Sequence, residues 1–92
     1  MKFDIFEAFR TLSMTFGPSG REHGIAETIT EIIAEVVPHI GDWDHHTDAM
    51  NNLIYHRSGE GKKVLLAAHM DSIGIVVTHI NDNGFARFAQ VG

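Results

Sequence analysis

The sequence contains no cysteine, which excludes a disulfide scaffold, a thiolate zinc site and a cysteine nucleophile. It has seven Lys and Arg residues against 12 Asp and Glu residues and no basic run, so we expect no nucleic-acid partner. The apolar run at residues 64–68 is far shorter than the about 20 residues of a membrane-spanning helix, so we expect no membrane association. Residues 1–16 lack the contiguous apolar stretch of a secretory signal, and we therefore expect a cytoplasmic protein.

Apolar residues, by contrast, are plentiful enough for an ordered core. They make up 43% of the 92 residues, and charged residues make up 21%, which is typical of a folded domain or part of one. Folded compactly, a chain of this size would expose about 5,300 Å² and bury roughly 64% of its unfolded surface. That allows a modest core but makes a substrate-enclosing pocket hard to build.

Two amphipathic helices are predicted in the first 38 residues. The first covers 3–16 and ends at Gly17-Pro18; its apolar stripe consists of Ile5, Phe9, Leu12 and Phe16. The second follows Ser19-Gly20-Arg21-Glu22, which has the form of a capping box with Ser19 as N-cap. Pro38 ends the second helix, whose stripe consists of Ile25, Ile29, Ile32 and Val36.

From residue 39 onward the pattern favours strands. We expect a polar edge strand within 39–47, a strand at 52–57, and a hairpin formed by 73–80 and 85–91 around the turn 81–84. The run 64–68 is apolar without alternation, which is typical of a central strand covered on both faces. The predicted fold class is therefore α/β with a three-layer α/β/α arrangement. Because both helices and this strand need more covering than the chain supplies, we expect the chain to be the beginning of something longer.

His69-Met70-Asp71 follows the predicted central strand directly, where ligands bind in open α/β sheets. The His69 imidazole could bind a divalent ion through one nitrogen while the Asp71 carboxylate orients the ring through the other. The alternative is a histidine hydrogen-bonded at the sheet edge, with Asp71 capping the next turn. The spacing alone leaves both interpretations open.

Other residues that could carry chemistry are less well placed. The segment 42–48 holds five possible ligands, but neighbouring strand residues such as His45 and His46 point to opposite faces, so a solvated edge strand is favoured. Ser19 and Ser72 lack the Gly-x-Ser-x-Gly pattern of a nucleophile, and Ser19 is better used as a helix cap.

Taken together, the motifs resemble the start of the M42 metallo-aminopeptidases, which include glutamyl and tetrahedral aminopeptidases and carry endoglucanase as an older label. The resemblance rests on Phe-Gly-Pro-Ser-Gly at 16–20, Thr-Asp-Ala-Met-Asn-Asn-Leu-Ile at 47–54 and Leu-Leu-Ala-Ala-His-Met-Asp-Ser-Ile-Gly at 65–74. Two positions depart from the family pattern: Ser72 stands where Glu is usual, and Asn51 where Gly is usual. Asn tolerates the left-handed backbone better than other non-glycine residues.

The resemblance implies an N-terminal segment of a zinc-exopeptidase-like catalytic domain at 1–72 and the first hairpin of an inserted β dimerisation domain at 73–92. It implies that His69 binds one of two divalent ions, zinc or cobalt, and that Asp71 orients His69. The remaining ligands and the catalytic base would come from beyond residue 92, so the 92-residue chain alone should be inactive. The implied parent hydrolyses N-terminal residues from peptides and forms a homo-oligomer.

Two other functions remain open. The chain could be a non-catalytic truncated product or an interaction module, whose partner is the rest of the same polypeptide or a second chain. The older family label suggests a polysaccharide hydrolase, but such enzymes need a carboxylate pair flanking the scissile bond, and no such pair is evident.

Overall fold

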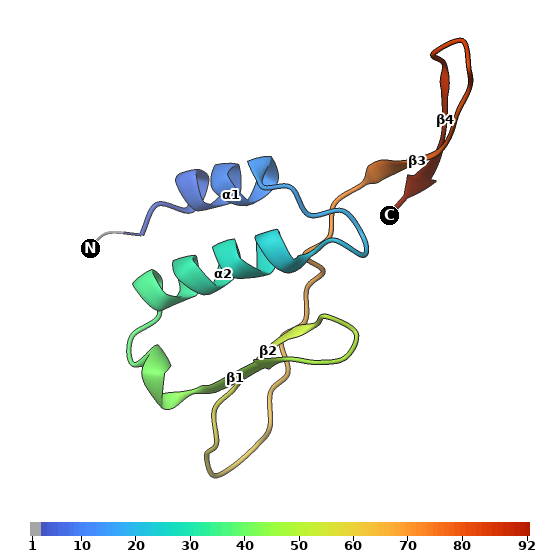
Figure 1. Cartoon of the computed structure of the whole chain (residues 1–92). Helices are drawn as coiled ribbons and strands as arrows, with labels where there is room; N and C mark the ends of the chain where they lie inside the picture. The colour runs from blue at the N-terminus through green and yellow to red at the C-terminus, as the bar shows by residue number, and fades with distance from the viewer. Residues whose placement is uncertain (1–2) are drawn as a thin grey trace.

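The computed structural model describes residues 3–92 as two helices followed by four strands in two small antiparallel sheets, a mixed α/β arrangement (Figure 1). The elements are α1 (Ile5–Met14), α2 (His23–Val36), a 3-10 turn (Ile40–Asp42), β1 (Asp44–Thr47), β2 (Leu53–His56), β3 (Gly74–Ile80) and β4 (Ala86–Val91). The first sheet pairs β1 with β2, and the second pairs β3 with β4. No helix in the described part of the chain is long and apolar enough to cross a membrane.

Helix α1 confirms the first predicted helix, shortened by two residues at each end. Its N-cap is Asp4, whose carboxylate accepts hydrogen bonds from the backbone N–H groups of Phe6 at 3.0 Å and Glu7 at 3.2 Å. These bonds satisfy two of the donors that a helix start leaves without an intrahelical partner. At the other end, Thr15 adopts an extended backbone and the helix stops before Gly17.

Helix α2 is present, but the prediction that Ser19 is its N-cap is wrong. Residues 18–21 form a separate turn closed by a hydrogen bond from Arg21 N–H to the Pro18 carbonyl (2.9 Å), with Gly20 at a φ of 87°. The helix therefore begins only at His23. A Glu22 carboxylate oxygen accepts from Gly20 N–H at 2.8 Å, not from the N–H of Ser19 as the predicted capping box requires.

The predicted edge strand at 39–47 is shorter than expected. His39 adopts a left-handed conformation with a φ of 57°, and a 3-10 turn follows it, so β1 begins at Asp44. The strand at 52–57 is confirmed as β2. The connection between the two strands contains Asn51 at a φ of 64°, which fits the tolerance of Asn for a conformation that glycine usually adopts.

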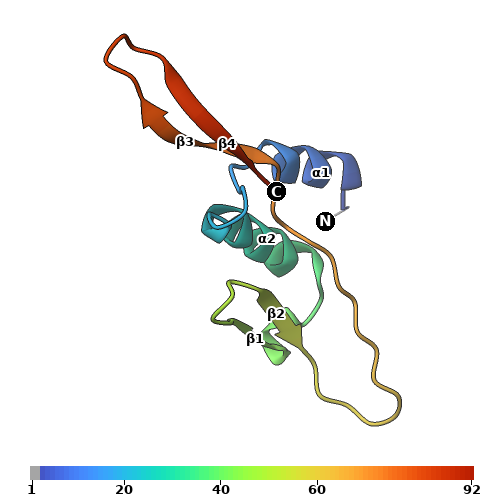
Figure 2. The same ribbon diagram turned by 90° about the vertical axis from the view of Figure 1, so that its right-hand side faces the viewer.

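Residues 64–68 do not form the predicted central strand in this structure. Leu65 and Leu66 are 89% and 91% exposed, and Figure 2 shows the segment as a stretched trace apart from the β1–β2 sheet. A strand is defined by backbone pairing with a neighbour. Among the described residues, each of the four strands pairs only within its own two-stranded sheet, so this segment has no pairing partner.

The hairpin at the end of the chain is confirmed. Strands β3 and β4 pair from Gly74 opposite Val91 to Ile80 opposite Ala86, with an irregularity between Val77 and His79. Gly84 in the turn has a φ of 88°, a conformation that glycine adopts without steric cost. The hairpin projects away from the helices (Figures 1 and 2).

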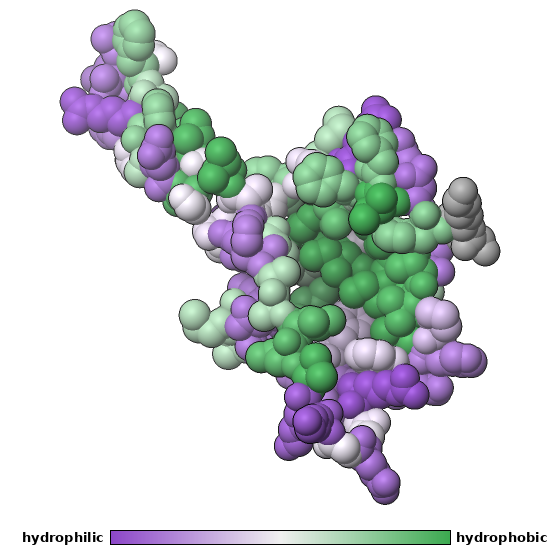
Figure 3. Space-filling view, turned by 180° about the vertical axis from the view of Figure 1, so that it is seen from behind, coloured by the Kyte–Doolittle hydropathy of each residue, from purple (hydrophilic) through white to green (hydrophobic). Residues whose placement is uncertain are grey.

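The chain is open rather than compact. Its radius of gyration is 17.5 Å, against about 12 Å for a compact domain of this length. Its accessible surface is 8281 Å², well above the roughly 5,300 Å² of a compact chain. Apolar side chains over the two helices face solvent (Figure 3). Within residues 3–92, Ile25 is the one large apolar residue that is buried, with 4% of its surface exposed.

Candidate functional site

Two segments far apart in the sequence meet next to the His-x-Asp motif. The N–H of Ser72 donates to the Gly17 carbonyl at 2.8 Å, and Pro18 and Ser72 form an isolated parallel bridge. The loop before α2 is thereby attached to the residues that follow His69. We call this contact, between residues 17–19 and residues 71–72, the loop contact.

Two glycines allow the loop contact to pack closely. A Cβ atom on Gly17 would lie 2.7 Å from Cγ2 of Ile25, the buried residue of α2. A Cβ atom on Gly74 would lie 2.9 Å from Cβ of Pro18. Gly17 and Pro18 are both buried, so the loop contact rests on the most densely packed part of the described chain.

His69 and Asp71 lie side by side at the loop contact. His69 Nδ1 is 3.2 Å from Asp71 Oδ1 and 3.1 Å from the Asp71 carbonyl oxygen. Both neighbours are acceptors, so this arrangement favours the tautomer with the proton on Nδ1 and the lone pair on Nε2. The His69 side chain is 86% exposed, and its Nε2 has no protein partner in residues 3–92.

The Asp71 carboxylate is held at both of its oxygens. The Ser19 hydroxyl donates to Oδ2 at 2.7 Å, while Oδ1 faces His69. The Ser19 hydrogen bond is the main reason that the pKa of the Asp71 carboxyl lies below its ordinary value; the His69 contact adds to it, and desolvation opposes it. No local sequence pattern indicates this bond, because Ser19 and Asp71 are 52 residues apart.

The histidine borders a shallow hollow of about 170 Å³. Its lining comes from three segments: Glu22 at the start of α2, residues 50–53 before and in β2, and residues 68–71. The hollow thus brings the Glu22 carboxylate, the Asn51-Asn52 turn and the His69-Asp71 pair around one space. In the sequence, Glu22 stands out only as the last residue of the expected capping box.

Known proteins of one family match this chain in sequence. A family model described as M42 glutamyl aminopeptidase matches residues 51–92, which include the His69-Asp71 pair. A candidate aminopeptidase of Acetivibrio thermocellus is 44% identical over 89 residues, or 97% of this chain and 26% of the relative. The lysyl aminopeptidase of Pyrococcus furiosus is 34% identical over 88 residues, or 95% of this chain and 24% of the relative.

The chain belongs to the M42 peptidase family. It spans about a quarter of the length of these curated relatives. A third relative, the candidate aminopeptidase FrvX of Escherichia coli K12, is 38% identical over 45 residues, or 49% of this chain and 13% of the relative. The resemblance found in the sequence is thus confirmed at the level of the family.

M42 membership implies a metal-dependent parent, and one residue here fits a metal ligand. The exposed Nε2 of His69 is free to bind an ion, since Nδ1 already faces Asp71. A tight site needs three or four protein ligands. Across residues 3–92, no three His, Asp or Glu side chains converge as they would around an ion. The described residues therefore do not form a complete site of this kind by themselves.

The segment 42–48 shows the alternation that argued against a metal cluster. His45 lies opposite Tyr55 and stacks on it at 5.1 Å between ring centroids, whereas His46 lies opposite Ile54 on the other face. Asp48 accepts from the Asn52 side-chain amide and from the N–H groups of Asn52 and Met50, each at 2.9 Å. These three hydrogen bonds stabilise the turn between β1 and β2.

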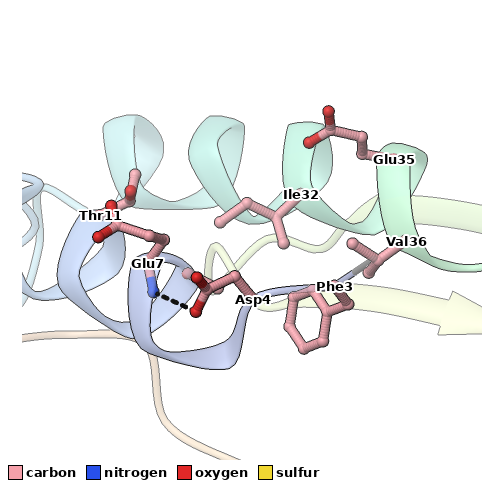
Figure 4. A pocket seen from close by; sticks show the side chains of 8 residues that line it. Phe3, Asp4, Glu7, Thr11, Ile32, Glu35 and Val36 are labelled. Carbon is pink, nitrogen blue, oxygen red and sulfur yellow. Dashed lines mark hydrogen bonds between the residues drawn. The ribbon is translucent and has the colours of Figure 1, made fainter. Parts of the chain in front are cut away.

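A second hollow, of about 250 Å³, lies between α1 and α2 (Figure 4). Its titratable residues are the carboxylates Asp4, Glu7 and Glu35, and Asp4 is occupied as the α1 N-cap. The rest of the lining is apolar apart from Thr11: Phe3, Ala8, Ile32 and Val36. It contains no histidine and lies apart from the loop contact, so His69 remains the centre of the candidate site.

Proposed function

We propose that this chain is the N-terminal part of an M42 aminopeptidase that removes N-terminal residues from peptides, and that His69 binds one of its two divalent ions, zinc or cobalt. The longer polypeptide that would contain residues 1–92 is called the complete enzyme below. In it, residues 1–72 would belong to a three-layer α/β/α catalytic domain. The proposal rests on membership of the M42 family and on the His69-Asp71 geometry.

The observation that carries this proposal is the arrangement around the His69 ring. Nδ1 faces two acceptor oxygens of Asp71, and Nε2 projects into solvent beside the hollow. A carboxylate beside the second ring nitrogen fixes the tautomer and increases the basicity of a metal-binding histidine. The alternative is a structural histidine whose hydrogen bonds only stabilise the local backbone. It explains the contacts of Nδ1 but leaves Nε2 without a role.

The chemistry of the complete enzyme would depend on groups from the rest of the polypeptide. The chemistry that two bound divalent ions would supply is activation of a water molecule and polarisation of the scissile carbonyl. This chain would contribute the His69 nitrogen and the Asp71 carboxylate that orients it. Because the described residues contribute one ligand, we expect the isolated chain to hydrolyse no peptide bond.

The experiment is turnover of amino-acid p-nitroanilides by the complete enzyme and by residues 1–92 alone, before and after treatment with a chelator. We expect the complete enzyme to cleave these substrates, to lose activity with the chelator, and to regain it with zinc or cobalt. Activity that survives complete metal removal would contradict the proposal, as would metal-loaded enzyme that cleaves no aminoacyl substrate. Turnover by the isolated chain would contradict the claim that the site is incomplete.

A second candidate function is that of a separate chain that assembles with the rest of the fold. The exposure of Leu65 and Leu66, next to the site, favours a chain that needs a covering partner. Mixing residues 1–92 with a separately produced remainder of the complete enzyme distinguishes the two. Recovery of activity would show that the two parts can function as separate chains, whereas activity restricted to a single polypeptide would support the leading proposal.

The remaining expectations concern assembly and compartment. We propose that residues 73–92 begin an inserted domain through which the complete enzyme forms a homo-oligomer in the cytoplasm. The projecting β3–β4 hairpin supports a separate domain beginning there (Figure 1). Size-exclusion chromatography with light scattering on the complete enzyme, with and without the insert, measures this directly: the deletion should yield monomers.

A further inference from the structure

We propose that Ser19 is a positioning residue: its hydroxyl fixes the Asp71 carboxylate in the orientation that holds the His69 ring for metal binding. The inference rests on the proposed metal-binding role of His69. It assigns Ser19 a function different from the helix-capping role that the sequence pattern predicts. Two linked contacts carry it, Ser19 Oγ to Asp71 Oδ2 at 2.7 Å and Asp71 Oδ1 to His69 Nδ1 at 3.2 Å.

The geometry explains why a carboxylate benefits from a second partner. A carboxylate held at one oxygen can rotate about the bond to its Cβ atom, because such terminal torsions have broad energy wells. In this structure each oxygen of Asp71 has its own partner, Ser19 on one side and His69 on the other. The two contacts together fix the plane of the Asp71 carboxylate. They thereby fix the direction from which Asp71 Oδ1 contacts the His69 ring.

The backbone supports the same function. Ser19 reaches Asp71 because the loop contact holds Gly17 and Pro18 against Ser72. Gly17 in turn packs on Ile25 of α2 so closely that a Cβ atom would not fit. Ser19 is therefore attached to the best-packed part of the chain, whereas residues 64–68 before His69 are exposed. Through its hydrogen bond to Asp71, the Ser19 hydroxyl attaches the exposed His69-Met70-Asp71 motif to this packed region.

The helix-capping alternative is inconsistent with the structure. Helix α2 begins at His23, four residues after Ser19, and has no side-chain cap bond at its start. The hydroxyl of Ser19 is instead directed to Asp71. The competing explanation is a purely structural role, in which the Ser19 hydroxyl only stabilises the loop contact. The experiment must distinguish this role from positioning of Asp71.

The test compares Ser19→Ala, Ser19→Thr and the control Ser58→Ala in the complete enzyme. Ser58 lies in an exposed loop. The measured quantities are zinc affinity by competition with a chromophoric chelator, and the His69 tautomer in metal-free protein from side-chain ¹⁵N shifts. Loss of a group that orients a metal-binding histidine typically costs about 10–100-fold in affinity. Ser19 acts one step further away, so we expect a loss of about 3–10-fold for Ser19→Ala.

Ser19→Thr keeps the hydroxyl and should restore most of the affinity, while Ser58→Ala should match the unmodified protein. In Ser19→Ala, the population of the His69 tautomer with the proton on Nδ1 should fall. If the role of Ser19 is purely structural, Ser19→Ala would lower the melting temperature but leave the His69 tautomer and the zinc affinity unchanged. That result would overturn the proposal.

A double-mutant cycle gives an independent outcome. If Ser19 acts through Asp71, Ser19→Ala should have almost no further effect on zinc affinity in the Asp71→Ala background, because residues in one network are not additive. Additive losses would overturn the inference. His69→Ala separates this failure from failure of the proposed function: if that variant keeps all its metal, the metal role itself is wrong, whatever Ser19 does.

Discussion

At the scale of single residues, we expect metal binding by His69 to depend on its contact with Asp71. Asp71→Asn keeps the size of the side chain but removes the charge that the Ser19 and His69 contacts stabilise. We expect the complete enzyme to bind metal more weakly and to lose about 10–100-fold in turnover. Metal titration and steady-state kinetics measure both, with the exposed hairpin variant Asp82→Asn as control. Complete loss of one ion would make Asp71 a direct ligand, and no change would reduce it to a turn residue.

Gly17 gives a second prediction at this scale. A methyl group at Gly17 would lie 2.7 Å from Ile25 Cγ2, closer than atoms can approach without displacement. Forcing extra atoms into a packed contact typically costs about 1–3 kcal/mol. Gly17→Ala should therefore lower the free energy of unfolding of the complete enzyme by about that amount in a urea titration. Gly59→Ala, where a Cβ atom has open space, should change it little; equal stability of the two variants would contradict the packing argument.

At the scale of elements, α1 depends on its N-cap. Asp4 accepts from two backbone N–H groups at the start of a helix whose side chains are largely exposed, so little tertiary packing compensates for its loss. Asp4→Ala should destabilise the helix by about 0.5–2 kcal/mol. Hydrogen exchange of the amides in the first turn measures the effect, since Phe6 and Glu7 should exchange faster. Unchanged exchange rates at these two amides would show that the hydrogen bonds of Asp4 do not stabilise α1.

The β1–β2 turn should depend on pH through Asp48. Hydrogen bonds from Asn52, first from its side chain and then from its backbone, hold the pKa of the Asp48 carboxyl below its ordinary value. The turn therefore gains stability that is present above the ordinary pKa near 4 and is lost as the pH falls through the lowered pKa. NMR shifts of the Met50 and Asn52 amides should follow this loss. Asp48→Asn should abolish the pH dependence; a retained dependence would assign it to another group.

The elements that the sequence predicts correctly are those with local signals. Both helices and the terminal hairpin follow from apolar periodicity and from the Asn-Asp-Asn-Gly turn, which are local signals. The strand at 64–68 did not form, because pairing depends on neighbours that the pattern of one segment cannot supply. Ser19 was misassigned for a related reason: its partner Asp71 is distant in sequence, and the local capping pattern suggested a nearer one. His69 and Asp71 were found as candidates because their spacing of two residues is itself local.

At the scale of the whole molecule, the open shape predicts that residues 1–92 self-associate in isolation. Large apolar side chains such as Phe9, Leu65 and Leu66 are at least 70% exposed. Exposed apolar patches and unpaired strand edges favour association between molecules. We therefore expect the isolated chain to self-associate, as seen by light scattering over a concentration series. A monodisperse monomer with a cooperative thermal transition would contradict this expectation.

The proposed function requires that His69 bind a metal ion in the complete enzyme. The most direct measurement is the number of metal ions per subunit, by inductively coupled plasma mass spectrometry, in the unmodified enzyme and in His69→Ala. His45→Ala and His46→Ala serve as controls, because those residues lie on the β1–β2 hairpin and on opposite faces of it. We expect His69→Ala to lose metal while its circular dichroism spectrum is preserved, and both control variants to keep their metal. A folded His69→Ala enzyme with its full complement of metal would contradict the metal-binding role of His69.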